Sequence, residues 1–128
     1  MYARPMHLIK QTDAPVFEAE GTTVTAYASP SRGASETSIW QVELAAGSAS
    51  PRHRLDREEV FLGSAGEAVV TMDGAEHVIG AGDCLIVPAG TTFTLAATGD
   101  APFRAFVCLP CGGRATVGGT TFVPPWAQ

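Results

Sequence analysis

The chain has 128 residues, of which 45% are hydrophobic and 16% are charged, and its formal net charge is −5. This length is typical of a single domain, and the apolar composition excludes an intrinsically disordered chain. Nucleic-acid binding is not expected, because no cluster of basic residues occurs beyond Arg52, Arg54 and Arg57. Residues 1–128 are therefore predicted to form one domain.

Neither a signal peptide nor a membrane span is predicted. Residues 1–17 lack a long apolar run after a basic start, and no run in the chain approaches the roughly 18 apolar residues of a span. A cytoplasmic location with reduced cysteines is the default expectation. Cys108 and Cys111 have C-x-x-C spacing, but Pro110 and the glycines that follow predict a strand entering a turn, so a redox or zinc site is not favoured.

Short strands are predicted along most of the chain, because brief apolar runs, several of them alternating with polar residues, are separated by glycine and proline. The expected strands, in chain order, cover residues 21–28, 37–47, 58–63, 67–72, 75–80, 83–90, 92–97 and 101–110. Asp73 and Gly74 predict a tight hairpin between the fourth and fifth of these. Pro124 and Pro125 exclude a central strand in the C-terminal tail.

Short strands at a spacing of about ten residues are typical of an antiparallel sandwich or barrel. The predicted fold class is all-β, and specifically an antiparallel double-sheet jelly roll with a cavity between its sheets. The barrel is expected to span roughly residues 21–110, with extended segments on both sides.

Two glycine-bounded motifs resemble those of the cupin superfamily. The first cupin motif, G-x5-H-x-H-x3,4-E-x6-G, is matched in part by Gly47, His53, Glu59 and Gly66. The second, G-x5-P-x-G-x2-H-x3-N, is matched in part by Gly82, Pro88 and Gly90. The resemblance implies a cupin β-barrel in which these glycines and the proline form the corners where strands leave each sheet. It also implies a homodimer as one option, because many cupins are dimeric.

The metal ligands that the resemblance implies are only half present. Metal-binding cupins use two histidines and a glutamate from the first motif and a histidine from the second. His53 and Glu59 stand at two of these positions, whereas Leu55 and Phe93 replace the two other histidines. No metal cofactor is therefore favoured. A divalent transition metal would need a substitute ligand, such as His77 in a His53–Glu59–His77 set, and the alternative for His77 is a strand residue with a partly exposed ring.

Small-molecule binding is the first function considered. An apolar cavity would be lined by large side chains, namely Trp40, Leu55, Phe61, Phe93 and Phe106, with His77 nearby. The alternative is that these side chains fill the barrel, and Trp40 and Phe106 are interpreted first as core residues. The expected partner is a small ligand or substrate, and neither nucleic acid nor a membrane is expected.

Acid–base catalysis without a metal is the second function considered. His53 and Glu59 are expected to face one another across the cavity mouth, where the carboxylate would raise the pKa of the imidazole and fix its tautomer. Burial beside Leu55 and Phe93 would raise the pKa of Glu59. Such a pair suits an isomerase, cyclase or lyase. A mononuclear metal enzyme with substitute ligands is the third option.

Overall fold

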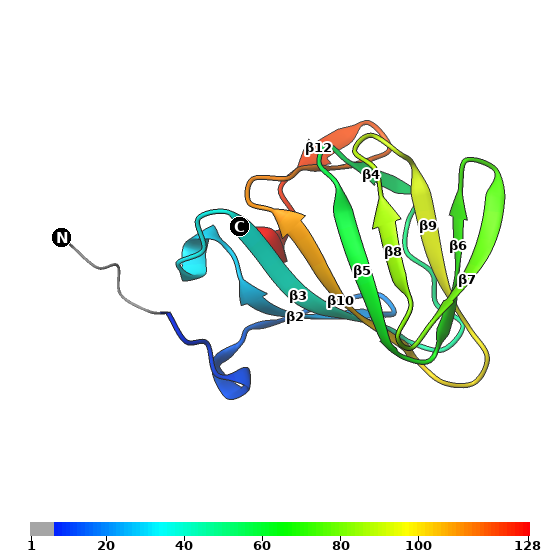
Figure 1. Cartoon of the computed structure of the whole chain (residues 1–128), viewed down its shortest axis with the longest axis horizontal. Helices are drawn as coiled ribbons and strands as arrows, with labels where there is room; N and C mark the ends of the chain where they lie inside the picture. The colour runs from blue at the N-terminus through cyan, green and yellow to red at the C-terminus, as the bar shows by residue number, and fades with distance from the viewer. Residues whose placement is uncertain (1–6) are drawn as a thin grey trace.

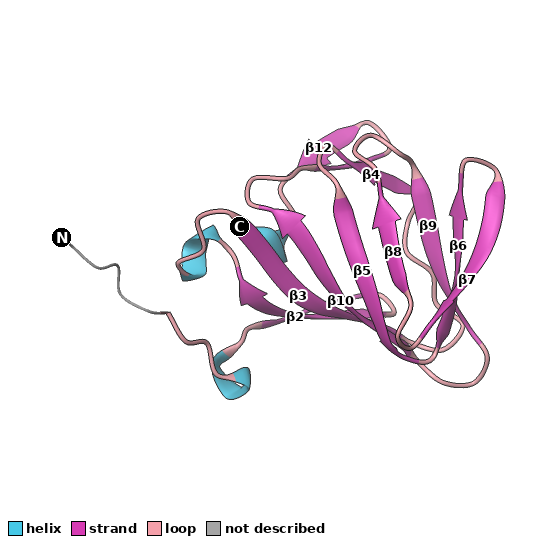
Figure 2. Cartoon of the chain, viewed as in Figure 1, coloured by secondary structure: helices cyan, strands magenta, loops and turns pink. Residues whose placement is uncertain are grey.

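A computed structural model describes residues 7–128, which fold into two facing antiparallel sheets of six strands each (Figures 1 and 2). The first sheet has, in spatial order, β1 (Val16–Ala19), β2 (Thr22–Ala28), β3 (Thr37–Leu44), β10 (Phe103–Pro110), β5 (Glu59–Ala65) and β8 (Cys84–Val87). The second has β12 (Thr120–Phe122), β11 (Ala115–Val117), β4 (His53–Leu55), β9 (Phe93–Thr98), β6 (Glu67–Met72) and β7 (Ala75–Gly80). Three short 3₁₀ helices complete it, namely η1 (Gln11–Asp13), η2 (Pro30–Arg32) and η3 (Pro125–Ala127).

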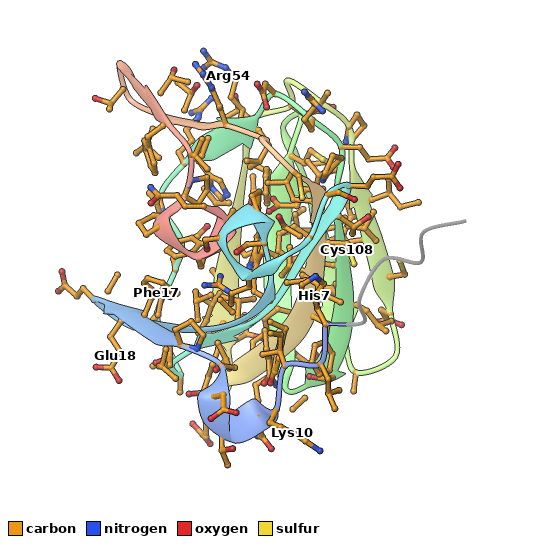
Figure 3. The ribbon with its side chains drawn as sticks, turned by 90° about the vertical axis from the view of Figure 1, so that its left-hand side faces the viewer. His7, Lys10, Phe17, Glu18, Arg54 and Cys108 are labelled. Atoms are coloured by element: carbon orange, nitrogen blue, oxygen red, sulfur yellow. The ribbon has the colours of Figure 1, made fainter. Side chains whose placement is uncertain are left out.

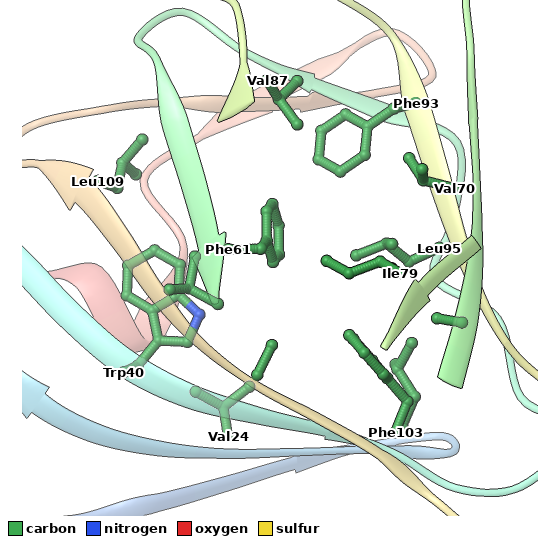
Figure 4. Close-up of a cluster of buried hydrophobic side chains, with 14 of the residues drawn as sticks. Val24, Trp40, Phe61, Val70, Ile79, Val87, Phe93, Leu95, Phe103 and Leu109 are labelled. Atoms are coloured by element: carbon green, nitrogen blue, oxygen red, sulfur yellow. The ribbon is translucent and has the colours of Figure 1, made fainter. Parts of the chain in front are cut away.

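The core lies between the two sheets because alternate residues of each strand point inward. On β10, every second residue is fully buried, namely Phe103, Ala105, Val107 and Leu109. Figure 4 shows Phe61 of β5 meeting Phe93 and Leu95 of β9 in the space between the sheets. This architecture confirms the predicted antiparallel double-sheet jelly roll.

All eight predicted strands are present, although several begin or end a few residues away from the expected positions. The Asp-Gly hairpin between β6 and β7 is confirmed. Asp73 and Gly74 both have positive φ, 52° and 74°, which is the conformation of the hairpin turn that this dipeptide favours. Strands β1, β4, β11 and β12 were not predicted, because each has only three or four residues and shows too little alternation.

Four motif glycines lie at chain corners, as the resemblance implied. Their φ angles lie in the left-handed region, at 76° for Gly47, 69° for Gly66, 85° for Gly82 and 80° for Gly90. Gly66 connects β5 in one sheet to β6 in the other, and a Cβ atom there would meet the carbonyl group of Pro102. A side chain at this corner would therefore force the backbone apart.

The C-terminal tail folds back onto the sandwich. Seen from the side that carries both η2 and η3, the C-terminal turn lies between Phe17 on β1 and the β11–β12 hairpin (Figure 3). The backbone carbonyl of Gln128 accepts hydrogen bonds from the amide and the hydroxyl of Ser31, at 3.2 and 2.6 Å. Within residues 7–128 there is no helix of the length and apolar character needed to cross a membrane.

Candidate functional site

A cavity of about 230 Å³ lies between the sheets, at the end where β1, β2 and β3 face β4, β11 and β12. Both sheets and the C-terminal tail contribute apolar side chains to its wall. These include Val24, Trp40, Val42, Leu44, Leu55, Phe61, Leu95, Ala115, Val117, Phe122, Pro124 and Trp126. The large side chains therefore do not fill the barrel, and an apolar space with few polar groups is what small-molecule sites commonly present.

His53 is one of the few polar side chains in this wall. Its Nδ1 lies 2.7 Å from the backbone carbonyl oxygen of Pro51, which can only accept a hydrogen bond, so Nδ1 donates and carries the proton. Burial lowers the pKa of His53 from its ordinary 6.5, and this hydrogen bond offsets part of that effect. The imidazole is therefore neutral near pH 7, with Nε2 free to accept a proton.

Glu59 is the second titratable group in the wall. It begins β5, pairs with Val87 on β8, and is only 4% exposed. Burial in apolar surroundings raises the pKa of its carboxyl group from 4.5 to about 8, as the sequence predicted in direction. Near pH 7 the group is therefore mainly in its uncharged acid form. Its Oε1 atom has no hydrogen-bond partner among residues 7–128.

His53 and Glu59 line the same cavity, but the direct pairing expected between them is not present. In the described part of the chain, the one ion pair joins Arg104 to Glu43, and the hydrogen bond of the His53 ring goes to Pro51. The expectation that the carboxylate raises the pKa of His53 is wrong, because burial lowers it and Glu59 is uncharged near neutral pH. A backbone carbonyl, not the carboxylate, determines the imidazole tautomer.

Four of the aromatic and aliphatic candidates lie inside the molecule. Trp40, Leu55 and Phe61 are 4–5% exposed and line the cavity, although Trp40 was interpreted first as a core residue. Phe93 was expected to line the cavity, but it is 1% exposed and belongs to the core, with its ring centroid 4.3 Å from that of His53 and 5.8 Å from that of Phe61. Its ring supports the wall from behind.

Phe106 and His77 lie away from the cavity, which corrects their place among the cavity residues, whereas an exposed strand position was the alternative considered for His77. Phe106 falls between the inward residues of β10, so its side chain is on the outer face of the sheet and is 38% exposed, opposite the exposed Leu62 of β5. His77 is exposed although Ile79, two residues later, is buried. The cause is the edge position of β7, whose first four residues extend beyond the core.

The donor atoms present do not fit a transition-metal site. Such a site needs three or four protein ligands, and no group of three or more His, Cys, Asp or Glu side chains able to hold a metal occurs within residues 7–128. His53 and Glu59 share the cavity with Leu55, while His77 is on the outside. The set of His53, Glu59 and His77, which was considered only as a substitute if a metal were bound, is therefore not brought together.

Trp126 is a cavity residue that the sequence did not identify. Its ring packs edge-on against Trp40 and Phe17, with centroid distances of 6.4 Å in both cases. Its indole Nε1 is buried and has no hydrogen-bond partner among the described residues. The sequence does show a large aromatic side chain in the extended C-terminal tail, and such a side chain is expected to pack against another apolar surface.

The chain is a double-sheet jelly roll that has a histidine and a glutamate in the wall of an apolar cavity between its sheets. The family model of the Cupin domain matches residues 40–109, and the chain belongs to the cupin family. No curated protein sequence matches the chain.

Several solved structures share the fold. The polyketide cyclase RemF from Streptomyces resistomycificus has a TM-score of 0.77 and 17% identity, over 94% of this chain and 89% of that one. A salicylate 1,2-dioxygenase from Pseudoaminobacter salicylatoxidans has a TM-score of 0.69 and 21% identity, over 83% of this chain and 31% of that one. A sugar phosphate isomerase of the cupin superfamily from Silicibacter pomeroyi has a TM-score of 0.66 and 24% identity, over 79% of this chain and 68% of that one. At these identities the likeness shows the fold alone.

Proposed function

We propose that the cavity binds a small, uncharged and largely apolar molecule, and that the acid form of Glu59 is its polar anchor. The observation that carries this proposal is the unpartnered Oε1 of Glu59 in an apolar wall. A buried polar group without a partner costs about 1–3 kcal/mol. A ligand with an acceptor oxygen relieves that cost, because a protonated carboxyl group can donate a hydrogen bond to it.

The charge of the ligand follows from the lining. No lysine or arginine occurs among the described residues that line the cavity, and His53 is mainly neutral near pH 7. A phosphate or carboxylate placed there would lose its hydration without gaining a counter-charge. Of the two substrate classes named among the structural neighbours, polyketides and sugar phosphates, the apolar lining therefore suits an uncharged polyketide fragment better than a sugar phosphate.

The size of the ligand follows from the volume. A closed apolar cavity of about 150 Å³ holds benzene in another protein. The cavity here measures about 230 Å³. It therefore accommodates a single ring with one or two substituents.

A second function, proton transfer at carbon, is favoured by the protonation states of the two titratable groups. Near pH 7 His53 is a neutral base and Glu59 is an uncharged acid. Nε2 of His53 would take a proton from the carbon beside a carbonyl group, and Glu59 would give a proton to the carbonyl oxygen, which yields an enol. Return of a proton to carbon, or closure of a ring, would complete an isomerisation or a cyclisation.

Three molecules of nearly identical shape test the binding proposal: acetophenone, its hydrocarbon analogue α-methylstyrene, and the anion benzoate. Titration calorimetry is expected to show that acetophenone binds several-fold tighter than α-methylstyrene, and benzoate weakest. Glu59→Gln keeps a neutral donor and should keep the preference for the ketone, whereas Glu59→Leu should lose it. Tighter binding of benzoate, or equal binding of the ketone and the hydrocarbon, would overturn the proposal.

Deuterium exchange tests the catalytic proposal separately. The methyl protons of acetophenone exchange slowly in neutral D₂O, so NMR can detect acceleration by the protein. The wild-type chain is expected to accelerate exchange, His53→Gln to abolish the acceleration, and Glu59→Gln to reduce it while binding survives. An unchanged rate in His53→Gln would exclude His53 as the base.

A further inference from the structure

The cavity contains a second buried polar atom without a partner besides Glu59. Trp126 lines the cavity, and its indole Nε1 is a buried atom that has no acceptor among residues 7–128. An indole N–H can only donate a hydrogen bond, so it needs an acceptor that the described residues do not provide. Buried donors without a partner are rare in folded proteins, and each one requires an explanation.

Trp126 is held in place firmly for a residue of a C-terminal tail. The Nη2 atom of Arg32 donates a hydrogen bond to the backbone carbonyl of Trp126 at 3.1 Å, and the next residue, Ala127, is 2% exposed. The indole ring is wedged edge-on between Phe17 and Trp40. The position of the N–H group is therefore fixed before any ligand arrives, which favours binding.

The polar groups of the cavity then form a pattern. Two of them, the acid form of Glu59 and the indole of Trp126, can donate a hydrogen bond and include a buried atom without a partner. They come from two separate elements, β5 and η3, and apolar side chains such as Leu55 and Phe61 also line the cavity. A ligand with a single oxygen would satisfy only one donor.

We propose that Trp126 is a ligand-binding residue whose indole N–H donates a hydrogen bond to a second acceptor oxygen of the ligand. The ligand class is thereby narrowed to uncharged, ring-bearing molecules with two acceptor oxygens on an otherwise apolar frame, such as alkoxy-substituted aromatic ketones. This inference rests on the proposed binding function. It adds a second polar anchor that lies outside both cupin motifs.

The 2′-, 3′- and 4′-methoxyacetophenones test this inference, each compared with the ethylacetophenone of the same substitution pattern. The two members of each pair have nearly the same shape, and the methoxy compound has an oxygen where the ethyl compound has a CH₂ group. Calorimetry on the wild-type chain is expected to show at least one methoxy isomer binding about five-fold tighter than its ethyl partner, which is the range of one hydrogen bond. In Trp126→Phe, which keeps an aromatic ring but lacks the N–H, that ratio is expected to fall to about one.

Arg32→Met provides the matched control. Loss of the Arg32 hydrogen bond loosens η3 without removing the indole, so both members of a pair should weaken equally and their ratio should persist. The inference is overturned if Trp126→Phe leaves the methoxy preference intact, if it weakens both members equally, or if no isomer is preferred in the wild-type chain. A preference for acetophenone over α-methylstyrene in the same wild-type chain would show that the binding function stands even when this inference fails.

Discussion

The imidazole of His53 and the phenyl ring of Phe93 lie 4.3 Å apart, centroid to centroid, with 43° between their planes. The two residues are cross-strand partners on β4 and β9. In a metal-binding cupin both positions would be histidines that share a metal. In this chain the partner ring is apolar and removes water from the imidazole, which keeps the imidazole neutral.

Replacement of Phe93 by leucine should raise the pKa of His53 towards its ordinary value of 6.5. The smaller side chain leaves space beside the imidazole, so water stabilises its charged form better. An NMR titration of the ring protons of His53 measures this change. A pKa of His53 that stays in place would mean that other neighbours desolvate the ring. The lost packing should lower the free energy of unfolding by about 1–3 kcal/mol.

Glu59 should make the protein less stable as the pH rises. The pKa of its carboxyl group is about 8 in the folded state against 4.5 as the ordinary value, so between these pH values the unfolded state loses the proton and the folded state keeps it. The free energy of unfolding therefore falls with rising pH, by a few kcal/mol over the whole window.

Urea unfolding of the wild-type chain and of Glu59→Gln between pH 7 and 9 measures this effect. In this range His53, whose pKa is lowered, is mainly neutral in both states. The wild-type chain should lose stability up to about pH 8 and then level off, while the glutamine variant should change less. Parallel curves for the two proteins would contradict the buried acid form of Glu59.

Substitution of Gly66 by alanine should destabilise the protein more than the same change at Gly90. Both residues have left-handed φ angles, 69° and 80°, which cost an alanine about 1–2 kcal/mol. A Cβ atom at Gly66 also meets the Pro102 carbonyl, whereas nothing lies within 4 Å of one at Gly90. Thermal or urea unfolding compares the two variants. Equal losses would show that the corner at Gly66 relaxes without strain.

Replacement of Leu55 by histidine should create a metal site. Residues 53 and 55 are two apart on β4, so their side chains point to the same face, and both line the cavity with Glu59. Three donors would then meet the minimum for zinc or nickel. Elemental analysis should find one metal per chain in Leu55→His and none in Leu55→Gln. An apo Leu55→His protein would mean that the two histidines and Glu59 cannot converge.

Eight strands could be predicted because alternation, apolar runs and turn residues are local features of the sequence. The hairpin turn at Asp73 and Gly74 needs positive φ at both positions, and the Asp-Gly dipeptide is one of the sequences that favour this conformation. Which side chains of each strand point into the core was harder to predict. Ile79 is buried and His77 is exposed, because β7 is the edge strand of its sheet and only its end reaches the core. No local pattern in the sequence indicates which strand lies at the edge.

The cavity could be predicted only in part. The motif positions placed His53, Leu55 and Glu59 in one wall, since their strand neighbours determine their direction. The distance between the side chains of His53 and Glu59 depends on how the two sheets separate, and Trp126 joins the wall through a tail that folds back over the whole sandwich. Such long-range packing leaves no local pattern in the sequence.

The tail that is held at Ser31 and Arg32 has a consequence for the order of folding. Ala19 and Trp126 both line the cavity, so the cavity wall brings together residues that are more than a hundred positions apart in sequence. A chain emerging from a ribosome can pair β2 with β3 early, but it cannot complete the cavity wall until Trp126 has been made. A nascent or truncated chain would therefore hold much of its sheet structure while presenting an open, water-filled apolar mouth, a state that chaperones recognise.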